Sequence, residues 1–479
     1  MSDAPQPSPT SSRFDRYTLA LIAILLAAIG IRLWGLDAQS LWHDEVLTTL
    51  SASVPFTQVA ESVEKNENKP PGYFFVINLW AHAFGMSEFS LRLPSVLFGV
   101  ASVWVMYLLG RDLFDDRRIG LIAALLLTFS RFHIAYSQEA RTYSLWFLLL
   151  LLSCCFTVGM TRRNSLVDQI GYVLAAAFAM YAHPFAAFAL LALNIYYFAT
   201  HFVLHPKPAT DPRRWLICQF AFSLLFWPWL QKTLLVVRTG LPWIIESTPF
   251  PEAILSYAGS VGLLAMLILL VGVALGYGLA RRERGIVLLI LLALLPTLGP
   301  LAFASRLYQT FIPRYGIIAV AALLLLAAYG IARLRPWATV LMCVAFVAVS
   351  MAHFRPGYGN YPGYEPKADI RGIARHVRSA SLGGDAVINP TRALLSRPIE
   401  HYFANTGVAI LGNTTDPPNP DKYPSLWAVY GIPEGYEATK PPGYNLIERT
   451  EFDHAILCHF MAPLSPEATT APSRTTTAP

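Results

Sequence analysis

The chain contains few charged residues and few cysteines. Only 14% of its 479 residues are Asp, Glu, Lys or Arg, whereas a soluble domain averages about 25%. Its five cysteines are too few for a disulfide framework, and they include no C-x-x-C pair that would indicate a metal site. The 36 basic residues outnumber the 30 acidic ones. They are scattered between apolar runs rather than gathered in a basic patch, which argues against a nucleic-acid partner.

Long apolar runs dominate the sequence instead. Hydrophobic residues make up 54% of the chain and the mean hydropathy is +0.45. The uncharged stretch from 169 to 204 would be about 54 Å long as a single helix, so it predicts two helices with a turn at His183-Pro184. We expect about eleven transmembrane helices, at residues 17–36, 92–110, 119–136, 142–160, 168–183, 184–203, 215–231, 257–280, 285–304, 315–332 and 337–353.

A further apolar run, from Gly72 to Gly85, reaches only about 21 Å as a helix. We expect it to lie in the membrane interface, or to dip into the membrane and return, without crossing it. If this run does not cross the membrane, fifteen Lys and Arg residues fall in short connectors on one side of the membrane, and nine fall in longer loops on the other side. The positive-inside rule places the short connectors in the cytoplasm. We therefore expect a multi-pass protein of the plasma (inner) membrane, with a cytoplasmic N-terminus and an extracytoplasmic C-terminal domain.

Composition also predicts the domain boundaries. From about Phe354 the sequence is of a soluble type, with an amphipathic segment at 367–379 and strand-like segments at 385–389, 427–430 and 455–458. The predicted fold class is an all-α polytopic membrane protein with a small extracytoplasmic α/β domain. The expected parts are a cytoplasmic tail (1–16), a transmembrane domain (17–353) with a long outer loop (37–91), the α/β domain (354–464) and a disordered tail (465–479).

Two acidic residues, Asp44 and Glu45, follow the first apolar run within the long outer loop. A carboxylate near the lipid–water boundary can accept a proton from an acceptor hydroxyl, so both are candidate catalytic residues. The same pair also suits the first turn of a solvated helix, where acidic side chains favour the positive end of the helix dipole.

Cationic side chains on the same predicted side are candidates for binding phosphate. Lys69 precedes two prolines that limit the freedom of the backbone, although a lysine at the edge of an apolar segment can also lie in the interface. Arg141 stands two residues after Glu139, a spacing at which helical side chains do not face one another. Arg314 can bind a phosphate bidentately, or anchor a helix end together with Tyr315.

The order of these motifs resembles that of a known family. They match the bacterial relatives of dolichyl-phosphate-mannose protein mannosyltransferases, which belong to the GT-C glycosyltransferases together with the aminoarabinose transferases that modify lipid A. The resemblance is strongest over residues 17–160. It is carried by WHDE at 42–45, KPPGY at 69–73, FSLRLPS at 89–95, LLGRDLF at 108–114, YSQEARTY at 136–143 and PRY at 313–315.

The resemblance implies a GT-C-like fold and a polyprenyl-phosphate sugar donor used on the outer face of the membrane. The acceptor would be a lipid, a protein or a glycan. A phosphate leaves as a stable anion, so no cofactor or metal is required if Lys69, Arg141 and Arg314 neutralise it. In the family, the Asp of the first loop is catalytic, which here is Asp44, and the lysine before the prolines contacts the donor phosphate, which here is Lys69. This chain has Asn68 where the aminoarabinose transferases have a glutamate, and it has a lysine where the protein mannosyltransferases have a histidine.

The sequence therefore predicts a set of site residues. Asp44, Glu45 and Glu139 are candidate catalytic carboxylates, and Lys69, Arg141 and Arg314 are candidate donor-phosphate ligands. Candidates for other substrate contacts are His43, Tyr73, Tyr136, Gln138, Tyr143 and His183.

Two other functions would leave different features in the sequence. A secondary transporter or lipid flippase would carry ionisable groups near the midplane, commonly in two repeated halves. Here the charges gather in loops and no repeat is visible. A membrane-anchored scaffold or sensor would use only the C-terminal domain to bind its partner.

Overall fold

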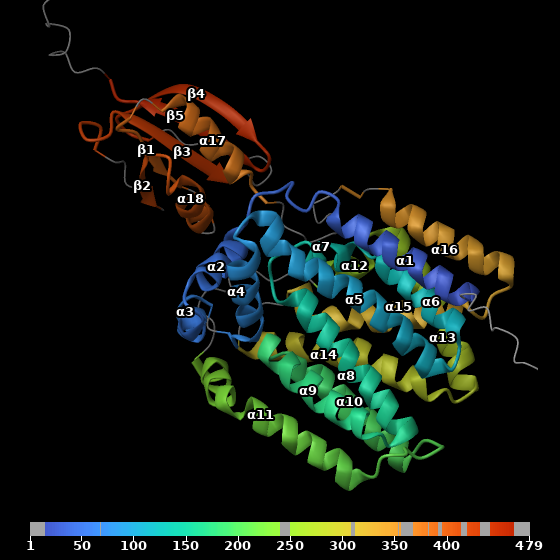
Figure 1. Cartoon of the computed structure of the whole chain (residues 1–479). Coiled ribbons are helices and arrows are strands. Elements are labelled where there is room, and N and C mark those ends of the chain that lie inside the picture. Colours follow the sequence, from blue (N-terminus) through green and yellow to red (C-terminus); the bar gives the residue numbers. More distant parts are fainter. Residues whose placement is uncertain are drawn as a thin grey trace, which may run out of the picture. The chain divides into compact units, whose positions relative to one another are not determined.

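The computed structural model describes most of the chain and divides it into two compact units (Figure 1). The helical unit comprises residues 1–36 and 51–364, and the sheet unit comprises residues 37–50 and 365–479. The two predicted tails lie almost entirely outside the described residues. Those described are 15–67, 69–239, 250–307, 312–352, 354–355, 367–381, 383–390, 395–412, 419–431 and 441–463.

Six helices of the described residues are long and apolar enough to cross a membrane. A seventh span is possible if α6 and α7 count as one. The predicted number of about eleven is not confirmed by this criterion, since three further apolar helices are shorter. The six are α1 (Arg16–Leu33), α5 (Glu88–Phe114), α8 (Tyr143–Arg163), α13 (Val261–Ala280), α14 (Arg284–Leu307) and η2 with α15 (Pro313–Gly316 and Ile317–Ile331).

Other helices complete this unit. The predicted turn at His183-Pro184 is confirmed, because α9 ends at Ala182 and α10 begins at Ala186. The run from Gly72 forms a helix of 13 residues, too short to span. The remaining helices are α3 (Val59–Asn66) with η1 (Phe56–Gln58), α4 (Gly72–Phe84), α9 (Leu166–Ala182), α10 (Ala186–Phe202), α11 (Pro212–Thr239), α12 (Phe250–Ala258) and α16 (Pro336–Met351).

Two predicted spans are not continuous. The run at 119–136 forms α6 (Arg117–Thr128) and α7 (Arg131–Ser137), which meet at a bend of 65°. Ser130 caps α7 with its hydroxyl, which accepts the backbone N–H of His133, and this cap starts a new helix direction. The run predicted at 257–280 begins in α12, and α13 starts only at Val261 after Gly259, whose φ is +86°.

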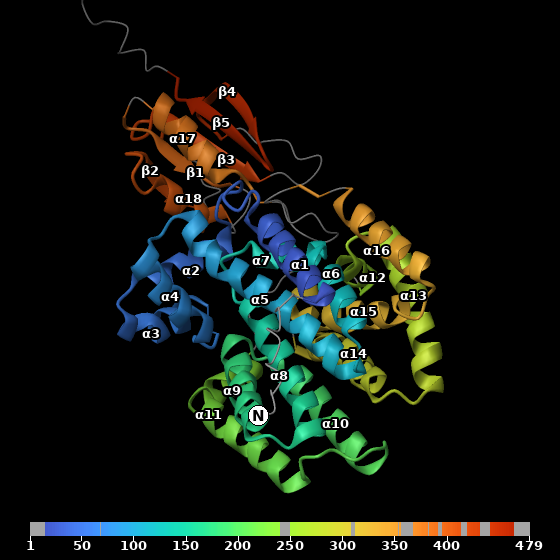
Figure 2. The same cartoon turned by 45° about the vertical axis from the view of Figure 1, so that its right-hand side comes forward.

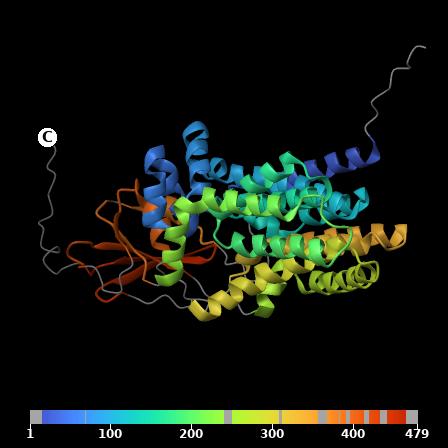
Figure 3. The same ribbon diagram turned by 90° about the horizontal axis from the view of Figure 1, so that it is seen from below.

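The helical unit has an apolar interior and an apolar outer surface. Its helices run roughly alongside one another (Figure 3), and α5 packs against α6 and α8 while α14 packs against α10 and α15. Large side chains on the outside are exposed, including Leu26 of α1, Leu224 of α11 and Ile268 of α13. An apolar surface of this extent suits lipid rather than water. The chain is therefore a multi-pass membrane protein.

The sheet unit contains one five-stranded mixed sheet in the order β2-β1-β3-β5-β4. Its strands β1 (Ala386–Ile388), β2 (Ala409–Gly412) and β3 (Ser425–Gly431) are parallel, and β4 (Asn445–Phe452) and β5 (Ala455–Met461) add antiparallel pairs. Helices α17 (Ile370–Ala380) and α18 (Ser396–Phe403) cover one face (Figure 2). Three of the strands and α17 match the predicted segments, while β2, β4 and α18 were not predicted.

The sheet unit also includes a segment from near the N-terminus. Residues 37–50, which the sequence analysis placed in the outer loop of the transmembrane domain, group with 365–479. Helix α2 (His43–Ser53) begins within this segment. The acidic pair at 44–45 is therefore packed with the C-terminal part of the chain.

Candidate functional site

Three predicted phosphate ligands come together in the helical unit. Lys69, Arg141 and Arg314 all act electrostatically on the imidazole of His183 and on the hydroxyl of Tyr143. The guanidinium carbon of Arg314 lies 5.5 Å from the centre of the Tyr143 ring. We call Lys69, Arg141 and Arg314 the cationic cluster. They come from three distant parts of the sequence, and the fold gathers them at one end of the helices.

A buried carboxylate joins two of these cations. Glu67 follows α3, and its side chain is only 2% exposed. Its Oε2 accepts from Lys69 Nζ at 3.0 Å and from Arg141 Nη2 at 2.9 Å, while Arg141 Nη1 contacts Oε1. Arg141 therefore binds Glu67 bidentately, which fixes the plane of the guanidinium. The sequence analysis did not select Glu67.

The start of α4 places Lys69. Pro70 and Pro71 restrict the backbone between Lys69 and the helix, which begins at Gly72. A Cβ atom at Gly72 would lie 2.8 Å from the backbone oxygen of Tyr181, near the end of α9. Glycine thus allows the Lys-Pro-Pro turn to pack directly on α9.

The short segment between α7 and α8 places Arg141, whose side chain is 1% exposed. The Thr142 hydroxyl donates to the backbone oxygen of Ala182 at 3.0 Å, and the Ser95 hydroxyl donates to that of Arg141 at 3.5 Å. The amide nitrogen of Gln138 donates to the backbone oxygens of Arg32 and Trp34. The amide N–H groups of Gln138, a candidate substrate contact, are thus used to hold α1 against this segment.

Arg314 lies in η2, directly before α15. The hydroxyl of Tyr257 donates to the backbone oxygen of Pro313 at 3.0 Å. Tyr257 also contacts the position that a Cβ atom at Gly316 would occupy. The Pro-Arg-Tyr motif is therefore fixed on both sides of Arg314. The half-buried side chain of Arg314 reaches the ring of Tyr143.

His183 is a buried imidazole among aromatic rings. Its ring stacks on Trp146 at 4.5 Å and lies 5.3 Å from Tyr315, and its Nδ1 accepts the backbone N–H of Phe185 at 3.2 Å. Burial lowers the pKa of His183 well below its ordinary value, and Lys69, Arg314 and Arg141 lower it further. The imidazole is therefore neutral near pH 7 and adds no charge to the cationic cluster.

Other predicted residues lie in the same unit. The Tyr136 ring is 5.0 Å from that of Tyr143, so it borders the cluster. Glu139 is 2% exposed, and its backbone oxygen accepts the N–H of Arg141. Tyr73, in the first turn of α4, is fully buried.

His43, Asp44 and Glu45 form the first turn of α2 in the sheet unit. His43 and Asp44 are half-buried, whereas Glu45 is fully buried. Its Oε2 lies 3.4 Å from the backbone N–H of Trp42 and 3.3 Å from Lys367 Nζ. The two adjacent acids thus have different surroundings, and only the Asp44 side chain is partly accessible.

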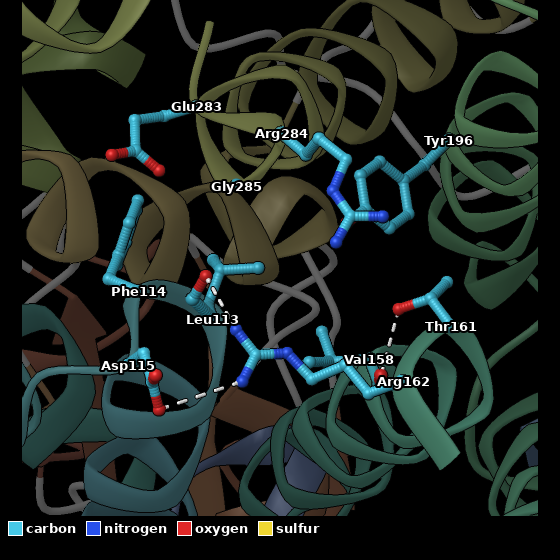
Figure 4. A pocket seen from close by; sticks show the side chains of 10 residues that line it. All are labelled: Leu113, Phe114, Asp115, Val158, Thr161, Arg162, Tyr196, Glu283, Arg284 and Gly285. Atoms are coloured by element: carbon cyan, nitrogen blue, oxygen red, sulfur yellow. Dashed lines mark hydrogen bonds and ion pairs between the residues drawn. The ribbon is translucent and has the colours of Figure 1, made fainter. Parts of the chain in front are cut away.

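The residues that the structure describes include no group of three or more His, Cys, Asp or Glu side chains that could hold a metal ion. A separate pocket lies at the other end of the helices, where α5 and α8 end and α14 begins (Figure 4). Arg162 and Arg284 point into it from different helices, and Asp115 and Glu283 also line it. Its two cations are balanced by two carboxylates, unlike the cationic cluster.

Comparison with known sequences agrees with the family resemblance. Residues 68–231 match the family model described as dolichyl-phosphate-mannose-protein mannosyltransferase. An uncharacterised protein of Aquifex aeolicus is 27% identical over 128 residues, which is 26% of each chain. The putative mannosyltransferase YycA of Bacillus subtilis is 26% identical over 160 residues, 32% of this chain and 23% of that protein. The chain thus matches about a quarter of the length of these relatives.

Solved structures extend the comparison to nearly the whole chain. ArnT from Cupriavidus metallidurans bound to undecaprenyl phosphate has a TM-score of 0.59 at 14% identity, covering 92% of this chain and 98% of that one. The oligosaccharyltransferase AglB of Archaeoglobus fulgidus, with an inhibitory peptide and a dolichol phosphate, has a TM-score of 0.52 at 10% identity. It covers 86% of this chain and 69% of AglB. The chain therefore has the fold of these proteins.

Proposed function

We propose that this chain, a relative of the GT-C glycosyltransferases by sequence and fold, transfers a single sugar from a polyprenyl-phosphate donor to an acceptor. The observation that carries the proposal is the cationic cluster, which lies beside neutral His183 in a helical unit with an apolar surface. An apolar surface accommodates a lipid tail, and the cluster suits the phosphate attached to it. The similar ArnT structure holds undecaprenyl phosphate and the AglB structure holds a dolichol phosphate.

The charge of the cluster fits the leaving group. In a polyprenyl-phosphate sugar the phosphate is a diester with one negative charge. When the bond between the anomeric carbon and the phosphate oxygen breaks, that oxygen keeps the electron pair and the phosphate gains a second charge. Three cations and the one carboxylate of Glu67 give these side chains a net charge of +2. They therefore stabilise the departing phosphate more than the bound donor, which is the requirement for catalysis.

The other half of the reaction needs a base. The acceptor hydroxyl attacks the anomeric carbon, and its proton passes to a carboxylate. We assign this role to Asp44, following the family resemblance, and attack opposite the phosphate would invert the anomeric configuration. Because Asp44 is half-buried while the neighbouring Glu45 is fully buried and next to Lys367, Asp44 is the better candidate of the two. Glu139 is a second candidate base.

The proposal is tested with purified protein in lipid nanodiscs. Undecaprenyl phosphates carrying radiolabelled mannose, aminoarabinose or galacturonic acid are supplied with a membrane lipid extract, and release of undecaprenyl phosphate is measured. Arg141→Met and Lys69→Met should lower turnover by about 100-fold or more, as does the loss of one donor from an oxyanion site. Asp44→Asn should abolish transfer while undecaprenyl phosphate still binds.

The matched control is Arg162→Met. Arg162 is a partly exposed arginine in the last turn of α8, whereas the buried Arg141 precedes the first turn. Its substitution should leave both turnover and undecaprenyl-phosphate binding within about twofold of the parent, since a distant site behaves independently. If Arg141→Met and Arg162→Met weaken binding equally, the cluster is not the phosphate site.

A further inference from the structure

The segment that carries the proposed base is attached to the sheet unit by its backbone. The backbone N–H of Leu41 donates to the hydroxyl of Tyr402, on α18, at 2.7 Å. Arg371, on α17, donates from Nη2 to the backbone oxygens of Asp37 and Ala38 at 3.0 and 3.2 Å. Backbone contacts of this kind fix the path of the chain independently of its side chains.

The start of α17 provides a second attachment. Asp369 is the N-cap of this helix, and its Oδ1 accepts both the N–H of Gly372 and the hydroxyl of Ser40, the latter at 3.0 Å. The Ser40 hydroxyl in turn accepts the N–H of Arg371 at 3.0 Å. Ser40 is thus inserted into the N-terminal cap of α17, so that movement of residues 37–41 would break its bonds to Asp369 and to the Arg371 N–H.

A buried ion pair continues these contacts into α2. Lys367 Nζ lies 3.3 Å from Glu45 Oε2, and the two side chains are 6% and 0% exposed. The ammonium also lies 5.7 Å from the centre of the Trp42 ring. Removing either charge would break this buried ion pair. Lys367 therefore contacts the residues on both sides of the His43-Asp44 pair.

Fixing Glu45 also fixes Asp44. Successive side chains on an α-helix point about 100° apart, so the direction of Asp44 follows from the orientation of the first turn of α2. With Glu45 held against Lys367, Asp44 can point only toward its own, more accessible side. Small errors in the placement of a catalytic group lower the rate steeply, without an equal effect on binding of the donor.

We propose that the sheet unit carries the catalytic segment of the enzyme and that Lys367 is a positioning residue for Asp44, acting through Glu45. This rests on the proposed function only for the role of Asp44. The sheet unit is then a working part of the transferase, since it determines the direction of the base.

The test uses the full chain in nanodiscs and compares three lysine variants. Lys367→Met should lower kcat at least tenfold, leave the donor KM and undecaprenyl-phosphate binding within twofold, and increase hydrogen exchange at residues 41–48. Lys367→Arg, which keeps the charge, should recover most of the kcat and of the exchange protection. The control Lys422→Met removes a lysine of the same unit that also lies over an aromatic ring, Tyr423, and should change none of these.

The coupling is tested by combining substitutions. If Lys367 acts through Glu45, Lys367→Met should have little further effect on kcat in a Glu45→Gln background. The proposal would be overturned if the double variant lost kcat by the product of the two single losses. It would also be overturned if Lys367→Met left hydrogen exchange at residues 41–48 unchanged. Exchange and binding are measured without a sugar donor. Failure of every donor to react, with the exchange result as expected, would therefore contradict the proposed function and leave the attachment of the segment supported.

Discussion

Single residues show how the fold surrounds a cationic site with neutral groups. His183 packs between Trp146 and Tyr315, and its Nδ1 is occupied by a backbone N–H. A protonated imidazole would place a fourth positive charge beside Lys69, Arg141 and Arg314. Its lowered pKa avoids this repulsion, because burial and the three cations all disfavour the charged form.

This lowered pKa predicts that stability falls in acid. In the unfolded chain His183 titrates near its ordinary pKa of about 6.5, whereas in the folded protein it remains neutral to lower pH. Below pH 6.5 the unfolded state therefore binds one more proton, and each pH unit costs up to about 1.4 kcal/mol until the folded pKa is reached. The thermal unfolding midpoint should decrease from pH 7 to pH 5, and His183→Gln should reduce this dependence. If the unfolding midpoint depended equally on pH in both proteins, the lowered pKa of His183 would be contradicted.

The residues of the cluster were predictable to different degrees. Lys69, Arg141 and Arg314 stand in recognisable motifs, and the spacing of the apolar runs places all three on one side of a membrane. Glu67 has no such signal, because it reaches Arg141 only through the folded chain, across 74 positions of sequence. The family resemblance implies a glutamate at position 68, where this chain has Asn68, and in the structure the carboxylate of Glu67, one position earlier, contacts the lysine.

At the scale of elements, the break between α6 and α7 is held by a buried arginine. Arg32, at the end of α1, donates to the backbone oxygens of Leu127 and Thr128, and it also contacts His133 and Ser137. These carbonyl groups lie at the end of α6, where the regular i+4 donors of a continuing helix are lacking, and the Leu127 oxygen also accepts the N–H of Ser130 at 3.3 Å. A single cation thus satisfies the end of one helix and fixes the direction of the next.

Close packing of α5 on this break predicts a specific glycine requirement. A Cβ atom at Gly99 would lie 2.8 Å from the Ser137 Cβ and 3.2 Å from Arg32 Nε. Gly99→Ala should therefore lower stability by about 1–3 kcal/mol. Gly30→Ala in α1, where nothing lies within 4 Å, should be neutral or stabilising by about 0.5–1 kcal/mol. Thermal unfolding in detergent measures both, and equal effects would show that the α5–α7 contact is not tight.

Element boundaries explain why the sequence predicted the helices better than their breaks. The mean hydropathy of 119–136 is that of an apolar run despite Arg131 and His133, and a bend inside such a run leaves the average unchanged. The local signs are the charged Arg131 and, before it, Ser130, a residue that favours an N-cap. Serine is common enough in membrane helices to be ambiguous. In contrast, the turn at His183-Pro184 follows from length alone, because no single helix could span both runs.

At the scale of the whole molecule, the membership of residues 37–50 in the sheet unit was not predictable. Ser40 and Asp369 are 329 positions apart, and neither lies in a pattern that would suggest the other. The local signals describe a loop following a membrane helix. Only the tertiary contacts show that this loop is part of the C-terminal fold.

The orientation of the chain is a prediction that cysteine labelling can check. Lys65, Asp421 and Lys207 are all exposed, and the distribution of basic residues places the first two outside and the third in the cytoplasm. In a protein whose partly buried Cys155 and Cys343 are replaced by alanine, Lys65→Cys and Asp421→Cys should react with a membrane-impermeant maleimide in intact cells. Lys207→Cys should react only after the membrane is opened. Reaction of Lys65→Cys and Lys207→Cys from the same side would contradict the topology, because these lysines precede α4 and α11 in connectors that the predicted arrangement assigns to opposite faces.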